Sequence, residues 1–308
     1  LVYIVVPARC RLGTITVRIS GAVEAPYFVL GRTDPDRWRG QIRYRPAPWA
    51  ELATDRVVLT VPSKVVRALD DPESLMRFWN QVLDACADLA AMPRKRRRPE
   101  RFVTDVQISA GYMHSGYPIM TLLDVAKVIV DRQCLLTNCH GGVWGLFHEL
   151  GHNHQSGAWT FEGTVEVTCN LFTLYVFDTV CGIAPARLRN FSAKARAKTI
   201  RAYLQGGPDF EQWKRRPFLA LLMYIQMQEG FGWDAFRRVF AEYRRLPPGE
   251  RPRTDQQKRD QWMVRFSRAV GRNLGPFFQA WGVPTSPEAR AAIAHLPTWM
   301  PPDFPPDG

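Results

Sequence analysis

The feature that most constrains this chain is a pair of histidines four residues apart, in the run His148-Glu149-Leu150-Gly151-His152. An α-helix turns about 100° per residue, so positions i and i+4 share a face and the two imidazoles can point at one ion. Zinc accepts imidazole nitrogen at about 2.0–2.1 Å and prefers tetrahedral surroundings. Glu149 lies one step round the helix, where it can take a proton from a water molecule that the ion activates. The spacing therefore predicts a helix with two zinc ligands and one general base.

The residues around the motif favour a buried helix. Val143, Leu146, Phe147 and Leu150 provide an apolar body. Two histidines and a glutamate in such a helix are costly to bury unless they have partners. A surface helix with incidental histidines would not need this apolar body, so we expect a metal site.

A catalytic zinc needs a third protein ligand and an open position. His154 lies about 200° round the helix from the second histidine and cannot easily reach the same ion. Glu162 and Glu166 are both candidates, and Asn170 continues the same face of the next helix. Glu162 precedes Gly163 and is expected at the helix entrance, whereas Glu166 should lie one turn inside, where a ligand is held more rigidly. We therefore predict Glu166 as the third ligand.

Residues 1 to about 62 are predicted to be β-rich because runs of Val, Ile and Tyr alternate with glycines and prolines. The expected strands are Leu1–Val6, Thr14–Ile19, Tyr27–Leu30 and Val57–Val61. From Asp71 apolar residues recur at steps of three and four, which predicts a helix as far as Leu89. Alternation returns at Phe102–Ser109 as a strand, and 111–118 is expected to be a loop.

The rest of the chain is expected to be mostly helical. Helices are predicted near 121–133, 143–155, 162–181, 186–205, 209–230, 233–246, 255–273 and 286–295. Pro217 should break or kink the fifth of these, and Gly230 and Gly232 should end it. The predicted fold is thus α+β. It comprises a β-rich N-terminal segment at 1–62, a helix and basic linker at 63–101, a catalytic core at 102–182 and a helical C-terminal subdomain at 183–308.

Lysine and arginine exceed aspartate and glutamate by 41 − 29 = 12. Such a surface favours acidic partners, but no nucleic-acid-binding motif accompanies it, so no nucleic acid is expected. The densest basic run, Arg94–Arg98, is predicted to be a solvated linker. No stretch approaches the roughly 20 apolar residues of a membrane span, so none is expected. The chain has neither an initial Met nor a basic leader region, so we expect a fragment whose localisation is open.

Six cysteines stand at positions 10, 86, 134, 139, 169 and 181, and none forms a Cys-x-x-Cys pair. Cys134 and Cys139 lie close enough in sequence to pair in an oxidising compartment. Free, mostly buried thiols are nevertheless the expected state.

Several segments carry a family resemblance that covers essentially the whole chain. The runs Val143–Gln155 and Trp159–Leu171 resemble the enhancin-type metallopeptidases, family sixty in the usual classification. In that family a glutamate on the following helix completes the site, and Glu166 matches it. Pro48–Asp55 and Pro276–Gly282 are similar to the vertebrate TRP-channel-associated factors, which carry an enhancin-type domain. Glu162-Gly163 and His154-Gln155 depart from those factors and look more like microbial mucin-degrading peptidases.

The resemblance implies a zincin-like catalytic core that binds Zn²⁺ and hydrolyses protein substrates, O-glycoproteins among them. Tyr224 and His114 are candidate donors to the oxyanion that forms in such a reaction. The candidate substrate-binding residues are Tyr112, Tyr117, Trp144, Trp159 and Glu162, the aromatic ones by stacking on sugar rings.

The alternative is a catalytically weak or inactive regulatory domain that keeps the fold and associates with a membrane cation channel. The first interpretation implies a secreted protein, and the second an intracellular, membrane-associated one.

Overall fold

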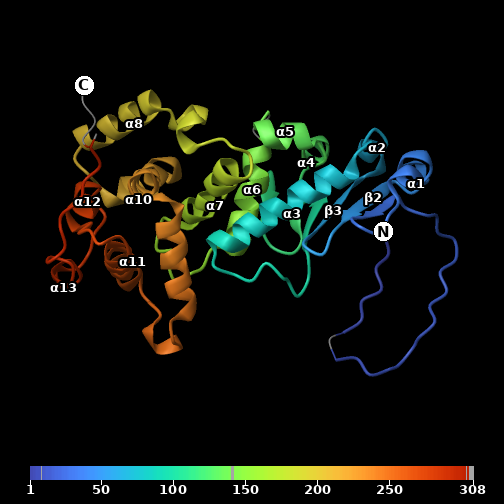
Figure 1. Ribbon diagram of the computed structural model, residues 1–308, viewed down its shortest axis with the longest axis horizontal. Helices are drawn as coiled ribbons and strands as arrows, with labels where there is room; N and C mark the ends of the chain where they lie inside the picture. Colours follow the sequence, from blue (N-terminus) through green and yellow to red (C-terminus); the bar gives the residue numbers. More distant parts are fainter. Residues whose placement is uncertain (8, 140–141, 303, 305–308) are drawn as a thin grey trace.

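The computed structural model describes residues 1–7, 9–139, 142–302 and 304. Figure 1 shows a β-sheet at one end of an elongated molecule and a group of helices from the second half of the chain at the other. Two helices, α6 (Gly142–His154) and α7 (Val165–Thr179), lie between these two ends. The predicted α+β fold, β-rich first and mostly helical later, is confirmed.

The sheet has six strands in the spatial order β1-β2-β3-β4-β6-β5. The strands are β1 (Tyr27–Val29), β2 (Trp49–Ala53), β3 (Val57–Pro62), β4 (Glu100–Thr104), β5 (Met113–His114) and β6 (Ile119–Thr121). The β2–β3 and β5–β6 pairs are antiparallel and the other pairs are parallel. Leu59, Phe102 and Ile119 lie side by side in register and are fully buried, so they form an apolar row on one face.

Helix α3 (Pro72–Leu89) covers the apolar side of the sheet. Asp71 caps it by accepting a hydrogen bond from Ser74 N, and a proline in the first turn fits because its missing N–H is not needed there. Trp79 of this helix lies 5.3 Å from Phe102 of β4 and 6.2 Å from Phe147 of α6, centroid to centroid. One buried indole thus joins the sheet to the helix that carries the histidine motif.

The other helices are short at the sheet end, whereas the far end contains both long and short ones. They are α1 (Pro35–Gly40), α2 (Ser63–Val66), α4 (Ala126–Ile129), α5 (Arg132–Thr137), α8 (Ala193–Gln205), α9 (Phe210–Lys214), α10 (Pro217–Arg245), α11 (Asp255–Val270), α12 (Gly275–Ala280) and α13 (Pro287–Ala291). Single 3₁₀ turns include η2 (Leu123–Val125), η3 (Pro185–Arg187) and η4 (Arg189–Phe191). Among the described residues, no helix is both long and apolar enough to cross a bilayer.

Helices α6 and α7 pack more closely than any bulky side chain would permit. A Cβ added at Gly151 would overlap the carbonyl oxygen of Cys169. Glycine at this position lets the two backbones touch, and the close approach brings side chains of α7 next to the histidines of α6.

Two of the predicted N-terminal strands were wrong. Leu1–Val6 and Thr14–Ile19 form no strand, and their apolar side chains are largely exposed. A strand needs a partner for its backbone hydrogen bonds, and high β-propensity does not supply one. The sheet uses Trp49–Ala53 instead, a segment that we did not predict as a strand. The strand predicted at 102–109 is also shorter, and begins two residues earlier, at Glu100.

The predicted helical region is correct in type but not in detail. The 121–133 segment divides into η2, α4 and the start of α5. Pro217 does separate two helices, α9 and α10. Gly232 kinks α10 rather than ending it, with a φ of 70° that favours glycine. The start of α7 also differs from the prediction. The helix begins at Val165, so Glu166 lies in its first turn and not one turn inside.

Cys134 and Cys139 form a disulfide, which corrects the expectation of free thiols at these positions. They flank the left-handed residue Asn138, which ends α5 shortly before α6. Cys86 and Cys169 are free and buried, as expected.

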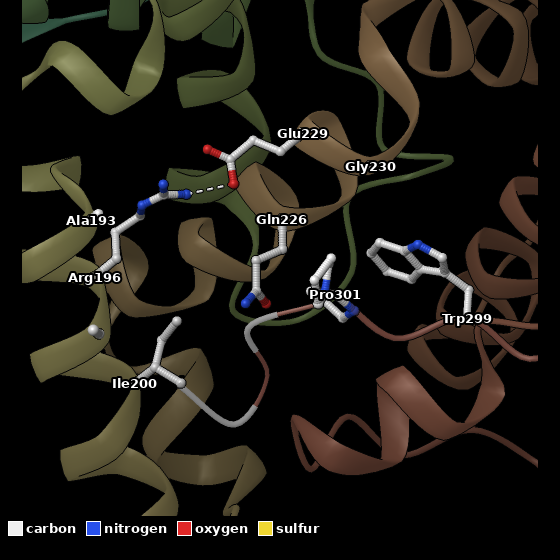
Figure 2. A pocket seen from close by; sticks show the side chains of 10 residues that line it. Ala193, Arg196, Ile200, Gln226, Glu229, Gly230, Trp299 and Pro301 are labelled. Atoms are coloured by element: carbon white, nitrogen blue, oxygen red, sulfur yellow. Dashed lines mark hydrogen bonds and ion pairs between the residues drawn. The ribbon is translucent and has the colours of Figure 1, made fainter. Parts of the chain in front are cut away.

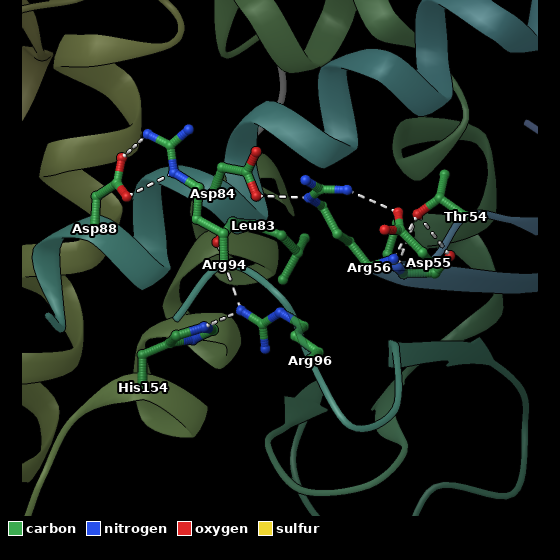
Figure 3. A network of polar contacts seen from close by, with 10 residues as sticks. Thr54, Asp55, Arg56, Leu83, Asp84, Asp88, Arg94, Arg96 and His154 are labelled. Atoms are coloured by element: carbon green, nitrogen blue, oxygen red, sulfur yellow. Dashed lines mark hydrogen bonds and ion pairs between the residues drawn. The ribbon is translucent and has the colours of Figure 1, made fainter. Parts of the chain in front are cut away.

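The basic run is solvated as expected except at Arg96, which is half-buried. Figure 3 shows the contacts of Arg94 and Arg96. Arg94 pairs with Asp88 of α3, and Arg96 lies 2.9 Å from Glu100 and 2.6 Å from His154 Nε2. Burial, and then the charge of Arg96, lower the pKa of His154 to about 3, so its ring is neutral and Nδ1 donates to the Leu150 carbonyl. The run therefore fastens α3 and β4 to the end of α6.

We expect Gly151→Ala to destabilise the fold strongly. The added methyl group would force α6 and α7 apart, and overpacking of this kind costs about 1–3 kcal/mol or more. Chemical denaturation measures the loss. Gly157→Ala is the matched control because an added Cβ there meets nothing within 4 Å. Equal stability of the two variants would mean that the close approach is not important.

Candidate metal centre

Three side chains from α6 and α7 converge on one point. His148 Nε2 lies 3.0 Å from His152 Nε2 and 3.0 Å from Glu166 Oε2, and the distance from His152 Nε2 to Glu166 Oε2 is 3.5 Å. The histidines share a helix face at i and i+4, as the motif predicts. Glu166 reaches them because the first turn of α7 lies against this face.

This triangle fits a tetrahedral zinc ion. Ligands held at about 2.0–2.1 Å from a tetrahedral centre lie about 3.3 Å from one another, close to the three observed separations. Two imidazole nitrogens and one carboxylate oxygen are also donors that zinc prefers. The Glu166 side chain is 52% exposed, so the point is open to solvent on one side.

Neighbouring amides orient both histidines. His148 Nδ1 donates to Asn170 Oδ1 at 2.7 Å, and Asn170 is itself held because its amide donates to the Glu166 carbonyl. The amide nitrogen of Gln155 lies 2.9 Å from His152 Nδ1, and the amide oxygen of Gln155 accepts a hydrogen bond from the Thr168 hydroxyl. His148 thus shows the arrangement typical of a metal-binding histidine, with Nδ1 donating to an amide oxygen and Nε2 facing the shared point. His152 Nε2 faces the same point, but its Nδ1 meets the amide nitrogen of Gln155, so its ring would serve as a ligand with the Gln155 amide turned to present its oxygen. The spacing suggested Asn170 beforehand. We missed Gln155, although it lies three residues after His152.

Charge is distributed across the site as a metal centre requires. Hydrogen bonds from His148 and His152 hold the pKa of Glu166 well below its usual value, so it is an anion. Burial raises the pKa of Glu149, although the two histidines oppose this. Burial, the largest single cause, lowers the pKa of His148, but hydrogen bonds with Glu166 and Asn170 and the charges of Glu149 and Glu166 together raise it above its usual value.

Cys169 is a fourth member of the cluster that the sequence analysis did not identify. Its Sγ lies 3.5 Å from His148 Nδ1 and 3.9 Å from Nε2, against the ring rather than at its coordinating tip. Burial raises the pKa of this thiol strongly, so it remains protonated. The sequence offered one signal for Cys169: it lies three residues after Glu166, so on a helix the two side chains share a face.

The loop at 111–118 forms one rim of the site. His114 of β5 is held by Ser109 and the Ser115 carbonyl, and its charge is one of those that lower the pKa of Glu149. Asn153 of α6 accepts from the backbone N–H of Gly116 at 3.1 Å and donates to its carbonyl at 3.0 Å. The rim is therefore attached directly to the motif helix.

The predicted aromatic residues fall into different environments. Tyr112 is 47% exposed, and its hydroxyl donates to the Asp124 carboxylate. Tyr117 is 43% exposed, and the Arg98 guanidinium carbon lies 3.6 Å from the centroid of its ring. Trp144 is half-buried on α6, one turn before His148.

Two candidate residues, Trp159 and Tyr224, lie in the core and not at the site. Trp159 is buried and stacked on Phe240 at 4.3 Å, so no sugar ring can reach it. Tyr224 is fully buried against Trp262 and cannot donate to a solvent-open site. Both are core residues, because an aromatic side chain at helical spacing packs as readily as it binds.

Glu162 lies outside the ligand cluster. It precedes α7, forms an ion pair with Lys214 of α9, and accepts no bond from the histidines among the described contacts. Gly163, with a φ of 80°, turns the chain between Glu162 and the helix.

The chain was compared with known proteins. It matches the family model of peptidase M60, enhancin and enhancin-like, over residues 21–282. It is 46% identical over 301 residues to TRPM8 channel-associated factor 2 of Bos taurus, and 45% identical over 302 residues to the Homo sapiens protein of that name. These alignments cover 97% of this chain but only 32% of the relatives, so the chain spans about a third of their length.

Solved structures share the fold. A conserved Bacillus anthracis protein of unknown function superposes with a TM-score of 0.76 at 26% identity, over 89% of this chain and 57% of that one. A metallopeptidase in complex with Tn antigen gives a TM-score of 0.66 at 15% identity, over 89% and 56% of the two chains. The ZmpB metallopeptidase of Clostridium perfringens gives 0.66 at 18%, over 92% and 57%. The sequence match over most of its length and the shared fold lead to one conclusion: the chain belongs to the enhancin and enhancin-like M60 peptidase family.

Proposed function

We propose that this domain is a zinc-dependent endopeptidase that acts on O-glycosylated protein. The observation that carries the proposal is the triangle of His148, His152 and Glu166 donor atoms, with the carboxylate of Glu149 adjacent in sequence and buried beside it. A fold in the M60 family could persist without such a geometry. The presence in this chain of both the base, Glu149, and the triangle of donor atoms supports hydrolysis.

The residues have distinct tasks in this proposal. His148, His152 and Glu166 would hold the ion, and Asn170 and Gln155 fix the two rings. A bound zinc ion polarises a carbonyl and lowers the pKa of water, which is the chemistry needed for peptide hydrolysis. Glu149 accepts the proton of the attacking water and passes it to the leaving amine. Burial raises the pKa of Glu149, which strengthens it as a proton acceptor. His114 would donate to the developing oxyanion in this proposal, which requires its Nε2 to exchange the Ser109 hydroxyl for the oxyanion.

A glycosylated substrate is supported by the exposed aromatic rim. Tyr112 and Tyr117 are partly exposed, although Arg98 lies over the Tyr117 ring, and Trp144 is half-buried on the motif helix. The solved metallopeptidase in complex with Tn antigen has the same fold, which is consistent with a carbohydrate-bearing substrate here.

The alternative function is channel regulation by a domain that binds and does not cleave. It is favoured by the names of relatives that are 42–46% identical to this chain and are called TRPM8 channel-associated factors. The intact Glu149, the base that hydrolysis needs, argues for catalysis without excluding the alternative. The two functions are separated by the experiments below.

We expect about one zinc ion per chain in protein purified without added metal, measured by elemental analysis. Glu166→Gln should weaken zinc binding by more than about 100-fold, because loss of a ligand costs more than loss of a supporting group. Glu162→Gln is the matched control and should leave affinity unchanged, because Glu162 pairs with Lys214 instead. Competition with a chelating dye measures both variants. If Glu162→Gln emptied the site, our ligand assignment would be wrong.

We expect Glu149→Gln to keep its zinc and lose hydrolysis by about 10²–10⁴-fold, because the residue is a base and not a ligand. Zinc content and turnover of a mucin substrate are measured on the same preparation. Equal turnover by the variant and the parent would remove Glu149 from the mechanism. A parent protein that binds zinc and cleaves nothing would favour the regulatory alternative.

We expect O-glycosylated protein to be cleaved faster than the same protein after enzymatic deglycosylation. The physical reason is stacking of sugar rings on the exposed aromatic rim. Product formation from the two matched substrates is compared by mass spectrometry. Faster cleavage of the stripped protein would contradict a carbohydrate-dependent site.

A further inference from the structure

A pocket lies between two helices of the C-terminal half, apart from the candidate metal centre. It has a volume of about 650 Å³ and is formed by α8, α10 and the segment 299–302 (Figure 2). Among the described residues that line it, none belongs to α6, α7 or the loop at 111–118. The proposed peptidase chemistry does not use this pocket, so a separate role has to be sought for it.

Most of the pocket wall is apolar. Ala193, Ala197 and Ile200 follow one another on α8 at steps of four and three residues, and therefore share a face. The two alanines leave space that longer side chains would fill. Trp299 forms another part of the wall, and Pro301 lines the pocket two residues later. A ligand of this pocket needs an apolar body.

The indole of Trp299 is held in place before any ligand binds. A Cβ added at Gly230 of α10 would lie 2.5 Å from its Cζ2, so glycine at this position lets the ring lie against the helix. The ring also lies 4.6 Å from Phe231 and 5.0 Å from Phe277, centroid to centroid. The backbone N–H of Trp299 donates to the Asn273 carbonyl at 3.1 Å. The pocket thus has a preformed aromatic wall.

Gln226 supplies the first polar group of the wall. Its side chain lines the pocket although the residue is only 9% exposed. Its Oε1 accepts a hydrogen bond from Trp281 Nε1 at 3.0 Å, which fixes the orientation of the amide. Figure 2 shows the amide end between Ile200 and Pro301. The Nε2 group donates to no other group within the described part of the chain, so it is free to donate to a ligand.

Arg196 supplies the second polar group. Its Nη1 donates to Glu229 Oε2 at 2.6 Å, so its positive charge is compensated at the edge of the pocket. Its Nε is buried and finds no acceptor among the residues that the structure describes. A buried donor without a partner costs about 1–3 kcal/mol, so a ligand that brings an acceptor would be stabilised here. Because the charge is compensated, the ligand need not be an anion.

The chemistry of the wall selects for carbonyl oxygens on an apolar backbone. The free groups of Gln226 and Arg196 are N–H donors, whereas Gln226 Oε1 and Glu229 Oε2 already accept hydrogen bonds. A polyproline helix fits this pattern, because proline has no backbone N–H and its carbonyls are free to accept. Proline-rich segments also dock on aromatic-lined grooves with little loss of entropy. Pro301 and Pro302 are themselves among the residues that line this pocket.

We propose that this pocket binds a proline-rich segment of a partner protein in the polyproline II conformation. Proline rings pack on Trp299 and on the alanine face of α8, and carbonyl oxygens of the segment accept from Gln226 Nε2 and Arg196 Nε. The proposal depends neither on peptidase activity nor on a bound metal.

The test uses two capped ten-residue peptides, one of proline only and one of alternating glycine and serine. Calorimetry measures their binding to the parent chain. We expect the proline peptide to bind at least about tenfold more tightly, because the flexible peptide loses more entropy and brings N–H groups that the wall cannot satisfy. Equal binding of the two peptides overturns the inference without any variant. So does failure of both to bind, which would leave a small neutral molecule as the occupant.

A blocking variant locates the binding. Ala197→Gln extends a longer side chain into the pocket and should weaken binding of the proline peptide by more than about tenfold. Ala202→Gln is the matched control, because Ala202 is exposed on the same helix and does not line the pocket. Circular dichroism checks that both variants fold. Unchanged affinity for the proline peptide in folded Ala197→Gln overturns the inference, since the peptide would then bind elsewhere.

Discussion

The contact between the α6 and α7 backbones at Gly151 is the constraint on which the centre of the molecule depends. Three donor atoms can meet only if the first turn of α7 lies directly against the histidine face of α6. A bulkier residue at 151 would separate the helices, and the carboxylate of Glu166 would move away from both imidazoles. The Leu-Gly pair inside the motif is therefore part of the metal geometry, although neither residue touches an ion.

The same contact explains how buried polar groups are tolerated here. His148, Glu149 and Asn170 would each be costly in an apolar helix pair. His148 and Asn170 offset one another because the close approach places imidazole and amide within hydrogen-bonding distance, and the Asn170 amide also donates to the Glu166 carbonyl. Glu149 is balanced by the charges of the two histidines, which lower its pKa against the effect of burial. The site is thus a polar network assembled between two otherwise apolar helices, and each member depends on the others for its orientation.

The fold class and the convergence of His148, His152 and Glu166 could be predicted from the sequence, whereas individual elements of the fold could not. The i, i+4 histidines and the i+4 relation of Glu166 to Asn170 are local, so helix geometry was enough to place them. Leu1–Val6 and Thr14–Ile19 could not be judged locally, because whether they form strands depends on a partner strand that no pattern specifies. Trp159 and Tyr224 failed for a related reason. An aromatic side chain gives the same signal whether it faces the core or the solvent, and only tertiary packing decides.

The two hydrogen bonds between Asn153 and the backbone of Gly116 have a consequence for how substrates are admitted. They tie the rim to the motif helix, because one side chain both accepts from and donates to the backbone of the loop. If the proposed peptidase function holds, substrate would enter an opening whose edge is already ordered, so little conformational entropy would be lost on binding. Such an opening would admit a bulky, branched polymer from the side, where a hinged flap would exclude it.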